Sequence, residues 1–202
     1  MSQLPDGLSP DAVQAAVRER YSGVAAEPAR DFGFPVGRAF AEAVGYAPEL
    51  LAALPAEAAE AFAGVACPVP RAELHPGETV VDLGCGAGLD SLLAARAVGE
   101  TGHVIGVDFA PQMVERARRV ANVARMPQVE IRLADGCALP LADESADAVL
   151  VNGIFNLNPD KTALLREAGR VLRPGGRLVA AEIILTAPLP EGEGHSLDDW
   201  FR

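Results

Sequence analysis

The stretch VVDLGCGAGLD, residues 80–90, decides the fold of this chain. An apolar strand is expected to end at Asp82, and three glycines then turn the chain into a helix. Because glycine has no Cβ atom, such a turn can adopt unusual backbone angles and bring backbone N–H groups against a ligand. The stretch therefore predicts a ligand-binding strand–turn–helix unit around Gly84, Gly86 and Gly88.

The spacing of these glycines differs from the dinucleotide-binding fingerprint. That fingerprint, G-x-G-x-x-G, needs a glycine or alanine where this chain has Leu89. A D-x-G-x-G-x-G turn suits a ligand that lacks a pyrophosphate and whose amino-acid part lies over the glycines. A glycine-rich turn can also be purely structural, so the function has to be inferred from further motifs.

From residue 77 onward, strand and helix patterns alternate, which is typical of a parallel sheet with helices on both faces. The strands are predicted at residues 79–83, 103–107, 129–133, 148–151 and 178–185. Helices are predicted after the glycine turn, from Pro111, and over residues 160–172, before a turn at Arg173-Pro174-Gly175-Gly176. The sequence thus predicts a doubly wound, Rossmann-like α/β fold.

Three regions differ in composition. Residues 1–76 are rich in Ala and Pro, carry helical patterns near 10–20, 38–53 and 56–63, and are interpreted as a helical cap. Residues 77–185 form the α/β core, and residues 186–202 form a Pro/Gly-rich acidic tail. A full seven-stranded sheet would add a helix and an antiparallel hairpin after the fifth strand. We therefore expect these C-terminal strands to be missing, through an abbreviated fold or, as the helix-like ending favours, because the chain is a fragment.

Composition and charge exclude several classes of function. The 202 residues suit one domain, and a net charge of −11 would repel nucleic-acid backbones and anionic membranes. The N-terminus does not resemble a signal peptide, and no apolar run approaches the roughly 20 residues that span a bilayer. Three widely spaced cysteines without a C-x-x-C motif exclude a disulfide framework and a standard zinc site. We expect a cytoplasmic protein without a metal.

An acidic residue ends the second predicted strand. The stretch GHVIGVDFAP, residues 102–111, places Asp108 and then Phe109 at the carboxyl end of that strand. A carboxylate in this position can accept hydrogen bonds from both hydroxyls of a ribose. The alternative is that Asp108 caps the helix that starts at Pro111.

Two later stretches complete a crevice at the carboxyl edge of the sheet. In RLADGCALPL, residues 132–141, Asp135 can accept a hydrogen bond from an adenine amino group while the N–H of Gly136 reaches the ring. In ESADAVLVNGIFNL, residues 144–157, Asn152 lies at the mouth of the fourth strand, beside the reacting centre. The order and spacing of these motifs fit one nucleoside-binding crevice.

Residues 77–185 resemble the core of the class I S-adenosylmethionine-dependent methyltransferases. This resemblance implies S-adenosyl-L-methionine as cofactor, a small-molecule substrate and an in-line attack by a lone pair of the substrate. The residues that fall on positions used by that family for the cofactor are Asp82, Gly84, Gly86, Gly88, Asp108 and Asp135, with Phe109, Gly136 and Asn152 beside them.

Longer stretches are similar to one branch, the arsenite methyltransferases. The stretches are YSGV (21–24), GYAPELLAALP (45–55), AFAGVACPVP (61–70), GLDSLLAARAVGETGHVIGVD (88–108) and NGIFNLNPDK (152–161). Together they cover most of the chain, so the resemblance implies a methyltransferase of the arsenite type.

The chain departs from that branch at the thiols that bind trivalent arsenic. The family has a cysteine directly after the asparagine, where this chain has Gly153. Cys67 falls near the family's N-terminal arsenic-binding cysteine, so Cys67 and Asn152 are the candidate catalytic residues, although Cys67 equally fits a small buried apolar residue. Cys85 and Cys137 are interpreted as structural.

Three functions stay open. The first is methylation of a small molecule of the arsenite type. The second is methylation of a quinone-like or other metabolite, with which Gly153 agrees. The third is a cofactor-binding partner protein without turnover, which the intact acids argue against and the absent C-terminal elements favour. The sequence does not indicate an oligomeric state.

Overall fold

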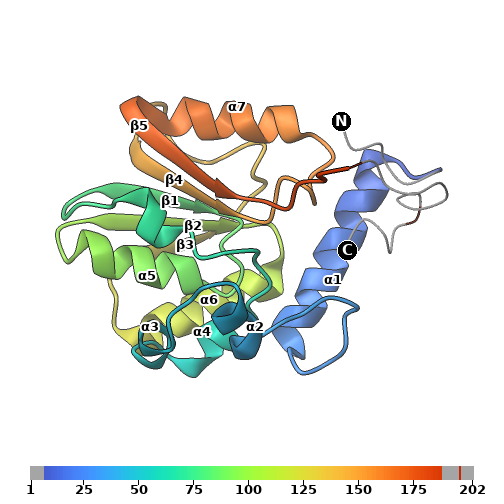
Figure 1. Ribbon diagram of the computed structural model, residues 1–202. Coiled ribbons are helices and arrows are strands. Elements are labelled where there is room, and N and C mark those ends of the chain that lie inside the picture. Colours follow the sequence, from blue (N-terminus) through green and yellow to red (C-terminus); the bar gives the residue numbers. More distant parts are fainter. Residues whose placement is uncertain (1–6, 188–195, 197–202) are drawn as a thin grey trace.

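The computed structural model describes residues 7–187 and residue 196, and a five-stranded parallel sheet lies at its centre (Figure 1). The strands are β1 (Thr79–Leu83), β2 (His103–Asp108), β3 (Val129–Leu133), β4 (Ala146–Asn152) and β5 (Leu172–Ala181). They lie in the order β3-β2-β1-β4-β5. The chain therefore builds outward from β1 in one direction and then returns to its other side. This reversal confirms the doubly wound fold, and ligands of such sheets bind where the order reverses, between β1 and β4.

Helices cover both faces of the sheet. Helices α5 (Leu89–Val98) and α6 (Pro111–Ala124) lie on one face, and α7 (Lys161–Val171) lies on the other (Figure 1). Helix α6 starts with a proline at its first position, and α7 starts where Asp160 accepts a hydrogen bond from the N–H of Ala163 at 2.8 Å. Because the central strands are covered twice, β1 and β4 read as nearly continuous apolar runs.

The N-terminal region is helical, as predicted. Its elements are α1 (Pro10–Ala26), α2 (Arg38–Ala43), α3 (Pro48–Ala52), α4 (Ala56–Glu60) and a 3-10 turn, η1 (Val69–Ala72). The proline-interrupted helical stretch predicted over residues 38–53 is two helices, because Gly45 takes a φ of 104° and Pro48 starts a new helix. Leu51 and Phe62 pack in one apolar cluster with Leu92 of α5. The N-terminal helices therefore share a core with the α/β layer.

Helix α1 extends beyond the predicted end at residue 20. Val24 and Ala25 continue its buried face, so the helix runs to Ala26. It crosses the side of the molecule toward which the strands point (Figure 1). This position makes α1 part of the outer wall of the crevice.

The fifth strand differs from the predicted range of residues 178–185. It begins directly after α7 at Leu172, and the turn predicted at residues 173–176 lies within it as a register irregularity. Ala146 pairs with Leu172, whereas Ala148 pairs with Arg177, so β5 carries extra residues at this point. Gly175 supplies the φ of 82° that this bulge needs.

Other parts of the described chain have no regular secondary structure. Residues 134–145, between β3 and β4, contain no helix, and residues 182–185 lie beyond the last strand. The tail predicted over residues 186–202 falls almost wholly outside the described residues. Within the described range, no helix has the length and apolar character needed to cross a membrane.

Candidate functional site

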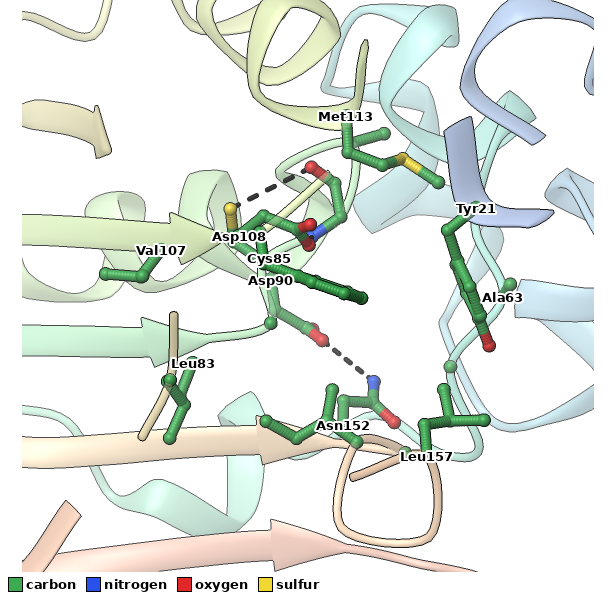
Figure 2. A pocket seen from close by; sticks show the side chains of 18 of the residues that line it. Tyr21, Ala63, Leu83, Cys85, Asp90, Val107, Asp108, Met113, Asn152 and Leu157 are labelled. Atoms are coloured by element: carbon green, nitrogen blue, oxygen red, sulfur yellow. Dashed lines mark hydrogen bonds between the residues drawn. The ribbon is translucent and has the colours of Figure 1, made fainter. Parts of the chain in front are cut away.

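A cavity opens at the carboxyl edge of the sheet, where β1, β2 and β4 end (Figure 2). The space between its lining atoms, counted out to the open mouth and including solvent there, is about 1020 Å³. The strand ends form one wall, and Figure 2 shows Tyr21 of α1 on the opposite side. The cavity therefore lies at the position that the strand order predicts.

The glycine turn forms the floor between β1 and α5. The N–H groups of Gly84 and Cys85 both donate to the carbonyl of Val107, at 2.8 and 3.0 Å, which ties the turn to β2. Gly84 has a φ of 78°, and a Cβ atom on it would lie 2.3 Å from Cγ2 of Ile154. Glycine is thus required here both by backbone conformation and by space. Gly84 and Gly86 line the cavity, whereas Gly88 starts α5 behind it.

Asp108 lines the cavity and fastens the glycine turn. One carboxylate oxygen accepts from the N–H of Gly86 and the other from the N–H of Ala110, both at 2.9 Å. Burial raises the pKa of Asp108, and these backbone hydrogen bonds lower it. The N-cap residue of α6 is Ala110. Asp108 is therefore not the helix cap that the sequence left as an alternative.

Asp82 lies behind the glycine turn. It is 2% exposed, and Oγ of Ser91 donates to its carboxylate at 2.6 Å. Burial raises the pKa of Asp82, with the nearby carboxylate of Asp90 as a further cause. Asp82 is not among the residues that line the described cavity. Asp82 therefore lies behind the glycine turn and connects β1 to α5 through Ser91, rather than facing the cavity.

The structure brings together the predicted cofactor-binding residues that follow β2 and β3. Phe109, Asp135 and Gly136 all line the cavity. The N–H of Cys137 donates to Oδ1 of Asp135 at 2.9 Å, which fixes the loop after β3. The guanidinium of Arg18 lies over the ring of Phe109, 5.4 Å from its centroid.

The side chain of Asn152 lines the cavity, and its polar atoms are occupied within the protein. Its oxygen accepts from the N–H groups of Val65, at 2.8 Å, and Ala66, at 3.3 Å. Its amide nitrogen donates to Asp90 and to the carbonyl of Ala66, both at 2.8 Å, and to Tyr46 at 3.1 Å. Asn152 thus holds the N-terminal segment against β4, which is a positioning role.

Sequence reasoning missed Asp90 and the two tyrosines. Asp90 lies in the first turn of α5, lines the cavity and is 6% exposed. The hydroxyl of Tyr46 donates to it at 2.7 Å. Burial and the nearby Asp108 raise the pKa of Tyr21. The sequence does offer one signal for Asp90. It is an acid that comes soon after the glycine turn, at the start of a largely apolar helix.

The three cysteines do not converge on the cavity. Cys67 is half-buried against the apolar cluster of Phe62 and Leu89 and is absent from the cavity lining. Burial raises the pKa of the Cys67 thiol to about 11, so it is protonated at neutral pH. Cys85 lines the cavity, and Cys137 lies beside Asn158 with 3.3 Å between sulfur and amide nitrogen. In the part of the chain that is described, no acidic, histidine or cysteine side chains form a group able to hold a metal.

Comparison with known families and proteins adds an independent observation. A family model described as a methyltransferase domain matches residues 74–202. The arsenite methyltransferase of Halobacterium salinarum is 40% identical over 198 residues, which cover 90% of this chain and 50% of that protein. A demethylmenaquinone methyltransferase of Desulfitobacterium hafniense is 39% identical over 119 residues, 57% of this chain and 46% of that protein.

A solved structure shows the same arrangement. The arsenic(III) S-adenosylmethionine methyltransferase of Chlamydomonas reinhardtii superposes with a TM-score of 0.66 at 36% identity, covering 73% of this chain and 52% of that one. This chain spans about half the length of the relatives it matches. The match to the domain model begins five residues before β1 and includes the whole sheet.

Proposed function

This chain belongs to the methyltransferase domain family, and we propose that it transfers a methyl group from S-adenosyl-L-methionine to a small molecule. The observation that carries the proposal is the cavity at the carboxyl edge, where the strand order reverses. There the Gly84 turn, Asp108 and Asp135 line one space, in the order that a nucleoside with an amino-acid tail requires.

The residues of the cavity fit this methyl donor. At Gly84 and Gly86 the turn presents backbone without a side chain to the amino-acid part. Asp108 would accept from the ribose hydroxyls, and Asp135 with Gly136 would hold the adenine ring beside Phe109. When bound, the donor supplies a methyl group that is already activated by its positively charged sulfur.

The protein then has to align the acceptor and exclude water. Tyr21, Phe62 and Leu157 form an apolar wall opposite the strand ends. Alignment in a dry site can lower the barrier by several kcal/mol, and a soft nucleophile needs no general base. His103 begins β2 at the opposite edge of the sheet and takes no part.

Two substrate classes fit, and the lining of the cavity separates them. Arsenite is held firmly by two or three converging thiolates. Of the three cysteines, Cys85 lines the cavity and Cys67 does not, and Gly153 has a φ of 81° that disfavours a cysteine there. The mainly apolar lining favours an apolar metabolite, and the similarity to a demethylmenaquinone methyltransferase supports a quinol as the second candidate.

We predict that the 202-residue chain methylates arsenite slowly and that Cys67→Ser changes this slow rate little. The reason is that the half-buried, protonated thiol of Cys67 does not line the cavity together with Cys85 and so contributes little to holding trivalent arsenic there. Methylated arsenic formed per hour, with glutathione present, measures the effect, and a quinol acceptor in the same assay tests the second candidate. Robust arsenite methylation, or a slow rate that Cys67→Ser abolishes, would contradict the prediction. Methyl-donor binding without turnover on either acceptor would favour a non-catalytic partner protein.

The proposal also includes the setting of the enzyme. A net charge of −11 is unfavourable for a nucleic-acid substrate, which supports a small molecule. The three cysteines are unpaired thiols, and free thiols are typical of a reducing compartment such as the cytoplasm.

A further inference from the structure

Three buried carboxylates lie at the carboxyl edge of the sheet without a cation beside them. Asp82, Asp90 and Asp108 are 2%, 6% and 8% exposed. None of the three takes part in an ion pair of the described residues. Burying a carboxylate without a counter-charge is costly. Burial raises the pKa of all three carboxylates, and a positively charged ligand in the crevice would favour their ionised form.

The three carboxylates have different surroundings. Asp82 lies behind the turn, and both oxygens of Asp108 are held by backbone N–H groups at the nucleoside end. Asp90 lines the cavity beside Asn152, and its hydrogen bonds come from two neutral groups (Figure 2). Hydrogen bonds from Asn152 and Tyr46 lower the pKa that burial raises, so of the pair Asp82 and Asp90 it is Asp90 that keeps its charge more readily.

We propose that Asp90 recognises the positive charge on the sulfur of the methyl donor, so that the cavity holds the donor more tightly than the spent product. This inference rests on the proposed function. Once the methyl group has left, with the bonding electron pair kept by sulfur, the ligand keeps the rest of its skeleton but has lost that charge. A carboxylate in a site of low dielectric distinguishes the two ligands by charge alone.

Calorimetric titration of the 202-residue chain with S-adenosylmethionine and S-adenosylhomocysteine tests this inference. We expect the parent to bind the donor about tenfold more tightly than the product. Asp90→Asn should weaken donor binding about tenfold and product binding about twofold or less. Sinefungin, which carries an amine in place of the methylated sulfur, should follow the donor in both proteins.

Two control variants separate charge from geometry. Asp135→Asn makes the same acid-to-amide change at the nucleoside end, so it should weaken donor and product equally. Tyr46→Phe removes a hydrogen bond of 2.7 Å to Asp90 and thereby raises the pKa of Asp90, so titration at a pH high enough to ionise Asp90 should give the parental donor-to-product ratio. Thermal unfolding of each variant shows whether it is folded. The donor-to-product ratio of the parent tests the inference without any substitution.

The outcomes are distinct. Equal weakening of donor and product by Asp90→Asn would mean that the carboxylate contacts the amino group, which both ligands keep, and would overturn the inference. A parental ratio near one, or a ratio that collapses in Tyr46→Phe at a pH that ionises Asp90, would overturn it as well. If the parent bound neither ligand, the proposed function itself would fail. Normal product binding with an unchanged ratio in Asp90→Asn would leave the proposed function standing and remove only the role of Asp90.

Discussion

Gly84→Ala is expected to abolish binding of the methyl donor and to lower the free energy of unfolding by about 2–4 kcal/mol. Gly84 takes a φ of 78°, which an L-amino acid with a Cβ atom rarely adopts. The added methyl group would also lie 2.3 Å from Cγ2 of Ile154. That carbon is attached to the branched Cβ of Ile154, so relief requires movement of the loop after β4, which also lines the cavity.

Gly86→Ala is the matched control in the same turn. Gly86 has a φ of 51°, and a Cβ atom on it would meet nothing within 4 Å. Only the backbone cost of about 1 kcal/mol should remain in the free energy of unfolding. Urea unfolding of both variants measures the difference. Equal effects of the two substitutions would show that the close approach to Ile154 does not constrain the turn.

Arg116→Met is expected to lower the free energy of unfolding by about 3–4 kcal/mol, because it removes a buried guanidinium that joins three segments. Arg116 of α6 is 6% exposed and donates to the carbonyls of Ala25, at 3.0 Å, and Glu57, at 3.1 Å. It also donates to the carboxylate of Glu60 at 2.6 Å. Methionine keeps the apolar stem but leaves these acceptors of α1 and α4 without their donor.

The control for this variant is Arg119→Met on the same helix. Arg119 pairs with Glu57 at 3.1 Å, but both side chains are about half exposed, so the cost should be roughly 0.5 kcal/mol or less. Chemical unfolding of both variants, followed by circular dichroism and by ligand binding, measures the two effects. If Arg116→Met lowered the free energy of unfolding as little as Arg119→Met, the hydrogen bonds of Arg116 would not hold the N-terminal helices to the core.

The fold was predictable because its signals are local. The runs that became β1 and β4 are nearly continuous apolar segments, and the glycine turn after β1 has a distinctive spacing. Asp108 and Asp135 could be placed at one site because parallel strands bring their carboxyl ends to one edge. The start of β5 was missed because a bulge opposite Ala146 lets the strand continue through a proline and two glycines.

The rest of the site depends on contacts that have no local signal. Tyr46 and Asp90 are 44 residues apart, and Asn152 meets Val65 across 87 positions. The sequence places Asn152 at the reacting centre, and its hydrogen bonds to a distant segment have no signal there; its catalytic role stays a prediction. The assignment of Cys67 to the chemistry stays a prediction, because its thiol lies outside the cavity lining.

The central claim is that the cavity at the ends of β1, β2 and β4 binds an adenosine-containing methyl donor and not a dinucleotide. Titration calorimetry of the chain with S-adenosylhomocysteine and with NAD tests this claim most directly. The predicted result is binding of one S-adenosylhomocysteine per chain with a dissociation constant of about 1–100 μM, and no heat with NAD. Tight binding of NAD without any response to S-adenosylhomocysteine would contradict the account.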